Sequence, residues 1–446
     1  MARTLVVVET VLLFVLGVLI IVAGLLLSIG LHELGHFAFA KLFKVRVGQF
    51  MIGFGPTLWS RRRGETEYGV KAIPLGGYIS MAGMFPPARR ADGAVDGPVD
   101  AASPRPQRAR PSTTGLFDVL VQDAREASAD TILAGEEERV FYKLAWWKRV
   151  IIMLAGPAMN LVLAIVFAAI LVCGLGLPVP STTIADVGSG TPAAAGGLRA
   201  DDRVVEIDGT DITSYTQMTA IIRAHAGRQM TVVVDRGGSR ETLRITPESR
   251  QVQVYDRWGT PATDWLGQPV LTRAGFLGIG SYTSMQRQDL GSAFAYLGSD
   301  IEGIAKIVVT LPARVTQTVQ STLEGKKRDG SGPISLVGIG EIAGQVAASD
   351  SPILNRTVAM VSVLAQLNVA LFVFNLVPLL PLDGGHVVGA VWEAVRRRFA
   401  AWFKRPDPGP VDMAKLVPLT LLVTGVLALM SLALIVVDIV NPIIIS

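Results

Sequence analysis

The sequence predicts an α-helical integral membrane protein with about four transmembrane helices, a β-rich segment and one α/β domain outside the bilayer. Half of the 446 residues are hydrophobic and only 17% are charged, which is too apolar for an ordinary soluble protein. Long apolar runs alternate with regions of soluble composition. The net charge of only +4 gives no reason to expect nucleic acid as a partner.

A spanning helix needs roughly 20 mostly apolar residues. The segments that meet this requirement are residues 1–44, 148–177, 357–395 and 416–440. The first is expected to be retained, because its basic N-terminal part is minimal and its apolar run is too long for a cleaved signal peptide. Cys173, the only cysteine, falls in the second span, so no disulfide can form within the chain.

Basic residues set the expected direction of these spans. Lys41 ends the first span, Lys148 and Arg149 begin the second, and residues 396–415 form a basic cytoplasmic loop before the fourth. The positive-inside bias puts both termini, and the region between the second and third spans, outside the cytoplasm. Since a helix rises about 1.5 Å per residue, His32 is expected toward the cytoplasmic side of the bilayer.

The first span contains ionisable residues at a depth where lipid disfavours them, in the motif "HELGH". His32 and His36 are four residues apart, so both imidazoles project from one helix face and can bind one zinc ion. Glu33 is placed to accept a proton from the attacking water. A catalytic zinc needs a third protein ligand, and Asp383 is another acid in an apolar setting, at the end of the third span.

Each of these residues also has a simpler explanation. A HExxH pattern can arise by chance in a helix, and a lone intramembrane aspartate can pair with a base. Chance is disfavoured here, because two of the four histidines of the chain fall in this one motif within a membrane span.

The residues resemble the site-2 proteases, and among them the bacterial, PDZ-containing zinc metalloproteases of regulated intramembrane proteolysis, of an actinobacterial or similar type. The resemblance rests on "HELGH", on "LAGPAMN" at 154–160, on a PDZ-like module and on "NLVPLLPLDGG" closing the third span. It implies one Zn²⁺ per chain, held by His32, His36 and Asp383, with Glu33 as general base. His386 is expected to lie beside the site without binding the metal.

Two asparagines are candidates for contact with the substrate. Asn160 and Asn375 could hold the substrate backbone or the transition state, since amide groups can donate to a developing oxyanion. Hydrogen bonding between helices is an equal alternative for both. Gly156 and Pro157 are expected to permit close helix approach and a kink rather than to touch the chemistry, and Asn368 receives no role.

Residues 45–84 show β-rich runs separated by a turn around "RRRGE". The family resemblance implies a membrane-associated β-hairpin that offers an edge strand to an extended substrate. The alternative is a hairpin that only caps the helix bundle. Residues 85–140 are expected to form a cytoplasmic insertion that is partly disordered, because much of it is rich in Pro, Ala, Asp and Arg and lacks large apolar residues.

Residues 180–250 resemble a bacterial PDZ domain, with "VVEIDG" as the most diagnostic piece. Asp201 stands where many such domains have glycine, and aspartate tolerates a positive φ. The groove of a PDZ domain takes an extended peptide, often a free C-terminus, whereas a plug that excludes large outer domains is the alternative. Residues 251–356 contain an amphipathic helical pattern, expected to lie on the membrane or against the PDZ-like module.

The resemblance therefore implies an intramembrane zinc endopeptidase of a bacterial plasma membrane. Its expected partners are membrane lipid and a single-span membrane protein, such as an anti-sigma factor already trimmed by a first protease. A catalytically silent membrane scaffold is the alternative from another class, and it has no reason to keep the full set of metal-binding residues. A HExxH protease with glutamate as third ligand is disfavoured by "PLDGG".

The orientation of the spans can be measured directly. A reporter that works only in the cytoplasm should be active when inserted near Ala91, and a reporter for the outer face should be active near Gly238. The basic flanks give this result because they resist translocation. The opposite pair of signals would overturn the orientation.

Overall fold

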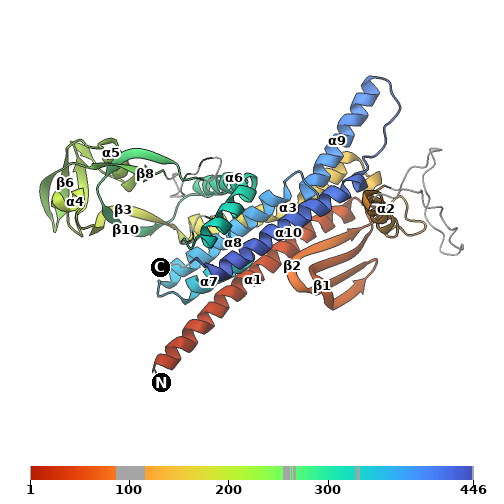
Figure 1. The fold of residues 1–446 in the computed structure, drawn as a ribbon, viewed down its shortest axis with the longest axis horizontal. Helices are drawn as coiled ribbons and strands as arrows, with labels where there is room; N and C mark the ends of the chain where they lie inside the picture. Colours follow the sequence, from red (N-terminus) through yellow and green to blue (C-terminus); the bar gives the residue numbers. More distant parts are fainter. Residues whose placement is uncertain are drawn as a thin grey trace. The chain divides into compact units, whose positions relative to one another are not determined.

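The computed structural model describes residues 2–86, 116–254, 262, 264, 268–326, 328 and 332–443. Two compact units make up the chain (Figure 1): residues 1–167 together with 297–446, and residues 168–296. The central part of the expected insertion at 85–140 lies outside the described residues. After it come α2 (Leu116–Ala129) and the short helix η1 (Phe141–Lys143).

In the described part of the chain, four helical segments are long and apolar enough to cross a membrane, as the sequence predicts. They contain α1 (Ala2–Leu42), α3 (Trp146–Ala169) with the π-helical turn η2 (Ile170–Leu175), α8 (Ile353–Asn375), and η3 (Met413–Leu416) with α10 (Val417–Val440). Valine and leucine side chains are exposed on the outside of these helices, such as Val11, Val162 and Leu429. This surface suits lipid rather than water.

The third predicted span differs from the single segment expected over 357–395. α8 ends at Asn375, and a new helix, α9 (Asp383–Trp402), begins after a seven-residue loop. Pro378 and Pro381 lie in that loop, and proline has no N–H to continue a helical ladder. The loop folds back on α9 so closely that a Cβ on Gly384 would lie 2.4 Å from the carbonyl oxygen of Val377. The break places Asp383 in the first turn of α9.

Small residues let α1 pack closely on its neighbours. A Cβ on Gly17 would lie 2.4 Å from the carbonyl oxygen of Ala343 in α7 (Leu336–Ala348), and one on Gly24 would lie 2.4 Å from Leu364 of α8. Close backbone approach of this kind is a common basis of helix association in lipid. It fixes α1, and hence its histidines, within the bundle.

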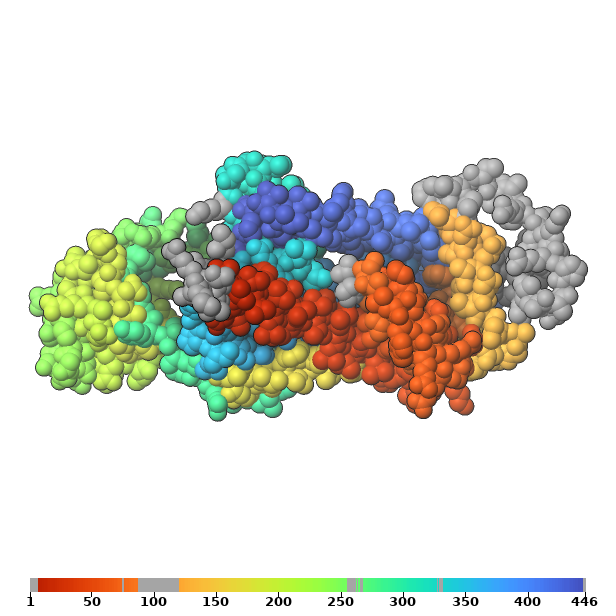
Figure 2. Space-filling view, turned by 90° about the horizontal axis from the view of Figure 1, so that it is seen from below, coloured from red at the N-terminus to blue at the C-terminus, as the bar shows by residue number. Residues whose placement is uncertain are grey.

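The β-rich segment forms an antiparallel sheet from β1 (Val47–Arg63) and β2 (Thr66–Met81). Both strands bend, so residues 66–70 pair with 59–63 on one side and with 49–52 on the other. Residues 47–52 also pair with 77–81, and residues 77–81 form one edge of the sheet. The sheet lies against the C-terminal part of α1 (Figures 1 and 2), where a Cβ on Gly30 would touch Ile52.

Glu65, at the turn between the two strands, fixes the sheet to the rest of this unit. Its carboxylate accepts hydrogen bonds from Arg139 at 2.8 and 2.9 Å and pairs with Lys41 at the end of α1. The Arg139 guanidinium, with the help of Lys41, lowers the pKa of Glu65 to about 2. The carboxylate is therefore ionised at every physiological pH.

Residues 168–296 contain a six-stranded sheet in the order β10-β3-β4-β6-β7, with β5 on β4. Its elements are β3 (Leu177–Val187), α4 (Pro192–Ala195), β4 (Arg203–Ile207), β5 (Thr210–Asp211), α5 (Tyr215–Ala224), β6 (Met230–Arg236), β7 (Ser239–Ile245) and β10 (Ile279–Gln286). β8 (Glu248–Gln253) pairs with β9 (Leu271–Phe276). One core includes the fully buried Ile184, Met218 and Val234.

This unit extends beyond the predicted range of 180–250. β10 pairs with β3 at the edge of the sheet, and Leu277 belongs to the same core as Ile184. The sequence pattern stops at 250 because the returning strand is separated from it by more than 20 residues. Asp201 has a φ of 70°, so the positive φ expected at this position is confirmed.

After the α/β unit comes the long helix α6 (Leu290–Leu323), which contains the predicted amphipathic pattern. On the predicted apolar face, Leu297 is buried and Ile301 and Ile304 are half-buried, whereas Phe294 is exposed.

Candidate metal centre

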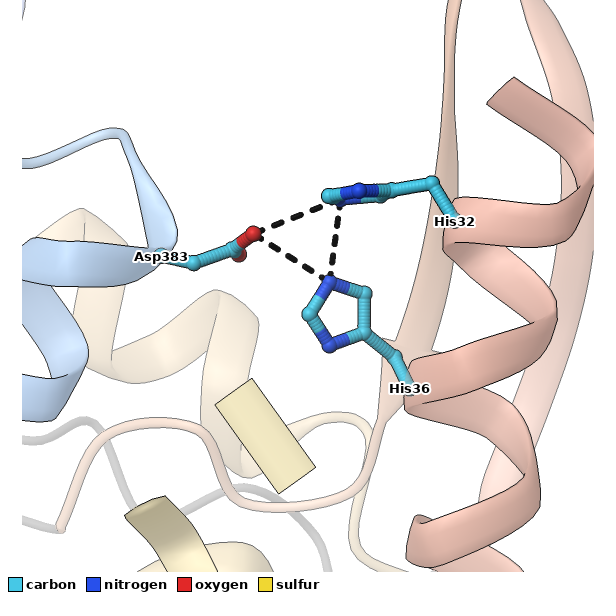
Figure 3. A group of neighbouring side chains, drawn as sticks. All are labelled: His32, His36 and Asp383. Atoms are coloured by element: carbon cyan, nitrogen blue, oxygen red, sulfur yellow. Dashed lines mark hydrogen bonds and ion pairs between the residues drawn. The ribbon is translucent and has the colours of Figure 1, made fainter. Parts of the chain in front are cut away.

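Three side chains from two distant parts of the chain meet inside the helix bundle (Figure 3). α1 supplies His32 and His36 from successive turns, and the first turn of α9 supplies Asp383. The Nε2 atoms of the two imidazoles are 3.1 Å apart, and each lies 3.3 Å from Asp383 Oδ2. His36 is buried, and the other two residues are partly buried.

The spacing of these atoms fits a tetrahedral metal ion. Zinc–nitrogen and zinc–oxygen bonds of about 2.0–2.1 Å put neighbouring tetrahedral ligand atoms about 3.3 Å apart. The three atoms therefore form one face of such a tetrahedron, and the fourth position remains for water or substrate. Two imidazole nitrogens and a carboxylate oxygen are ligand types that zinc accepts.

The outer nitrogens of both imidazoles are also engaged. His36 Nδ1 lies 2.7 Å from the carbonyl oxygen of Ile152, which can only accept, so Nδ1 carries the proton and Nε2 has its lone pair free for a metal. His32 Nδ1 lies 3.1 Å from the amide group of Asn160. Asn160 is fully buried, and its Oδ1 has no hydrogen-bond partner in the described chain.

The assignment of the oxygen and nitrogen atoms of the Asn160 amide decides which tautomer of His32 is favoured. Exchanging the two atoms, which are nearly indistinguishable by shape, lets Oδ1 accept a hydrogen bond from His32 Nδ1. This removes the unsatisfied acceptor and leaves His32 Nε2 free to bind a metal. A partner of this kind orients a metal-binding histidine and raises its basicity.

Gly156 of α3 permits a close approach of α1, as expected from the sequence, and the part of α1 that approaches is His36. A Cβ at this position would lie 2.2 Å from His36 Nε2, so the imidazole occupies the space beside the glycine that a side chain would fill. On the α1 side, a Cβ on Gly35 would lie 2.3 Å from the carbonyl oxygen of Ala155. The two glycines bring α1 and α3 together at the level of the histidines.

Glu33 lies between the two histidines in sequence and is 8% exposed. Its side chain packs on the edge of the β-sheet, where a Cβ on Gly77 would lie 2.7 Å from Glu33 Cγ and 3.2 Å from Oε1. Residues 77–81 form that edge. The arrangement brings a carboxylate and a strand edge to the same place.

The other residues considered in the sequence analysis are Asn375, Asn368 and His386. Asn375 Nδ2 donates to the carbonyl oxygen of Leu371 at 2.9 Å, and Asn368 Nδ2 donates to that of Leu364, so each amide bonds within α8. His386 lines a small cavity with Arg149 and is not among the three residues that converge. The carbonyl group of Ile152, which bonds His36 Nδ1, could not be predicted from the sequence, because every residue has a backbone carbonyl group.

Together, a HExxH helix within an apolar bundle and an aspartate brought to it from a second helix define an integral-membrane metallopeptidase. The chain belongs to Peptidase family M50, whose model matches residues 20–404. This is the site-2 protease family that the sequence motifs indicate.

Two zinc metalloproteases with similarity over most of the chain agree with this family. The chain is 33% identical to zinc metalloprotease Rip1 of Mycobacterium tuberculosis strain H37Rv, over 96% of this chain and 98% of that one. It is 29% identical to zinc metalloprotease RasP of Oceanobacillus iheyensis, over 84% and 90%. A solved PDZ domain of an SdrC-like protein from Listeria monocytogenes matches 21% of this chain and 87% of its own, with 24% identity and a TM-score of 0.15.

The protein is thus a multi-pass membrane zinc metalloendopeptidase of the site-2 type, and Zn²⁺ is its cofactor. These properties were predicted from the motifs and are confirmed by the family.

Replacing Gly156 with alanine should remove zinc, because the added methyl group would occupy the space of the His36 imidazole. We expect Gly156→Ala to bind substoichiometric zinc by mass spectrometry of the purified protein. Gly425→Ala is the matched control, since this membrane-helix glycine has no neighbour within 4 Å of an added Cβ. Equal zinc content in the two variants would contradict the packing of His36 on α3.

Asn160 offers a test between two roles. If its oxygen orients His32, Asn160→Ala should weaken zinc binding by roughly 10- to 100-fold, whereas Asn160→Asp, which keeps an acceptor, should retain it. If the amide instead donates to the transition state, both variants would bind zinc normally and both would lose activity. Zinc affinity and peptide cleavage are measured on the same preparations.

Proposed function

We propose that this protein cleaves peptide bonds in transmembrane segments, with His32, His36 and Asp383 holding the zinc ion and Glu33 acting as general base. The observation that supports this most directly is the triangle of ligand atoms, 3.1 to 3.3 Å on each side. When bound, zinc polarises the scissile carbonyl group and makes water a stronger nucleophile.

The role of Glu33 follows from its position. Three protein ligands already suit a catalytic zinc site, so a fourth is not needed. The Glu33 carboxylate accepts the proton of the attacking water and returns it to the leaving amine nitrogen, so that it is unchanged after each cycle. Gly77 leaves room for this side chain at the sheet edge.

The same edge suits an extended substrate. Residues 77–81 pair with β1 on one side only among the described residues, so their outer backbone groups remain available to another strand. A transmembrane helix must unwind before its peptide bonds can be attacked, and strand addition would hold the unwound segment beside Glu33. In this proposal the hairpin is associated with the membrane and does more than cap the bundle.

The α/β unit at 168–296 would act on the substrate as a PDZ-like module. β10 is an edge strand of its sheet and follows the glycine-containing segment 275–278. An extended peptide or free C-terminus could add to this edge. Exclusion of large outer domains is the other role, and both restrict cleavage to proteins already trimmed.

The proposed substrate is therefore a single-span membrane protein, such as an anti-sigma factor after a first cleavage, in a bacterial plasma membrane. Both termini would lie outside the cytoplasm, with the zinc site toward the cytoplasmic side, as the basic flanks favour. The silent-scaffold alternative is disfavoured by the convergence of three ligand atoms from α1 and α9.

The test separates metal binding from proton transfer. Glu33→Gln keeps the shape of the side chain but removes the proton acceptor, so zinc should stay near one per chain. Cleavage of a truncated single-span substrate should fall by at least ~10² to 10⁴. Asp383→Ala should lower zinc content as well as activity, because it removes a ligand.

Glu9→Gln is the matched control, since Glu9 is an exposed residue of the same helix. It should behave like the wild type in both measurements. An active Glu33→Gln protein would overturn the proposed base, and loss of zinc in that variant would make Glu33 a ligand.

A further inference from the structure

A groove lies between α9 and the segment that leads into α10. Its walls include Pro378, Leu380, Val388, Trp392 and Leu416. Among the described residues that line it, only Trp392 and Thr420 carry a nitrogen or oxygen on the side chain. The Thr420 hydroxyl is already used, because it donates to the carbonyl oxygen of Leu416. The groove is therefore suited to a hydrocarbon chain.

The apolar surface continues along α9 beyond the groove. Trp392 is 56% exposed, and Val395, Phe399 and Trp402 follow at intervals of three or four residues, with Trp402 81% exposed. This spacing puts the four side chains on one face of the helix. In Figure 1 the C-terminal half of α9 projects from the helix bundle. Exposed tryptophans and phenylalanines on such a helix suit the boundary between lipid tails and headgroups.

Cations follow or interrupt the groove-lining segments in the sequence. Lys415 lies between the lining residues Met413 and Leu416, and Arg396 is one turn after Trp392 on α9. Further cations lie along the rest of α9 and just after it: Arg397, Arg398, Lys404 and Arg405. Arg397 pairs with Glu393 and Asp407, and Arg396 donates to the carbonyl oxygen of Pro408. Arg398, Lys404, Arg405 and Lys415 have no side-chain partner within the part of the chain that the structure describes. The positive charge is thus only partly balanced by the protein itself.

The nearby acids do not compensate for these cations. Glu393 is 1% exposed and also pairs with Arg149, and Asp412 pairs with Arg125. These four cations are therefore available to an anionic group from outside the chain. Clusters of four to eight bases on an amphipathic helix or beside a membrane span recognise anionic lipid headgroups.

We propose that this groove binds an anionic phospholipid, with an acyl chain between α9 and α10 and the phosphate near Arg398 and Lys415. The apolar walls of the groove match the acyl chain of this lipid. The cationic rim, which is the set of six basic residues named above, matches its phosphate. A protein helix fits less well, because membrane spans tend to carry basic residues at their inner ends, and these would be repelled by the rim.

A lipid in the groove would contact the first two turns of α9, the helix that begins with Asp383. Gly385 and Gly389 line the groove within two turns of that residue. A lipid that binds the folded state only should also raise the melting temperature of the protein.

The test uses the full-length protein in detergent micelles and two lipids with the same brominated acyl chains. Brominated phosphatidylglycerol should quench tryptophan fluorescence at lower concentration than brominated phosphatidylcholine, and it should raise the melting temperature. Trp392→Phe should reduce the quenching amplitude, because it removes the indole in the groove. Arg398→Gln with Lys415→Gln should weaken the apparent affinity for phosphatidylglycerol roughly tenfold, at about 1 kcal/mol or less per cation.

Arg240→Gln with Arg244→Gln is the matched control, since it removes the same charge from exposed positions of β7. This variant should keep the full preference for phosphatidylglycerol. The proposal fails if the wild type does not distinguish the two lipids, or if the Arg398 and Lys415 variant distinguishes them as well as the wild type. Displacement of the lipid by inorganic phosphate at constant ionic strength, or by a single-span peptide, would also overturn it.

Discussion

The meeting of two imidazole nitrogens and one carboxylate oxygen within 3.3 Å of each other is the constraint on which the rest of this structure depends. Lone pairs that point at the same spot in an apolar bundle are costly unless a cation is shared among them. Both the local helix geometry and the tertiary fold of the chain bring the three ligand atoms together. The helical spacing aligns His32 with His36, and the broken helix after α8 delivers Asp383.

Close backbone contact is the means by which the fold builds this centre. Gly35 and Gly156 bring α1 against α3, and Gly77 brings the sheet edge against Glu33. A side chain at any of the three positions would meet a neighbour at less than 3.0 Å. The space beside Gly156 is filled by His36 and that beside Gly77 by Glu33, whereas Gly35, within the HExxH motif, lies against the backbone of Ala155.

A second set of polar contacts fixes the helix that supplies the aspartate. Glu393 of α9 pairs with Arg149 of α3 at 2.6 Å and accepts a hydrogen bond from the Val411 backbone. Breaking a buried pair of this kind by removing one partner is costly, because the other charge is left uncompensated. The pair therefore holds α9 in register with α3, which also carries Gly156 and Asn160. Together these contacts link the metal centre to the basic end of α9.

The sequence by itself indicated four apolar spans, the family and the residues that we propose to bind the metal. Long apolar runs and the four-residue spacing in HELGH are local patterns, which can be recognised in the sequence without knowledge of the tertiary structure. The sequence did not determine the break between α8 and α9, the return of β10 to the sheet, or the place of Gly156 against His36. Each of these is a contact between segments far apart in the chain, and only tertiary packing brings such segments together. For the same reason Asn160 could be recognised as a polar residue in a membrane span, but its position against His32 Nδ1 was decided by the crossing of α1 and α3.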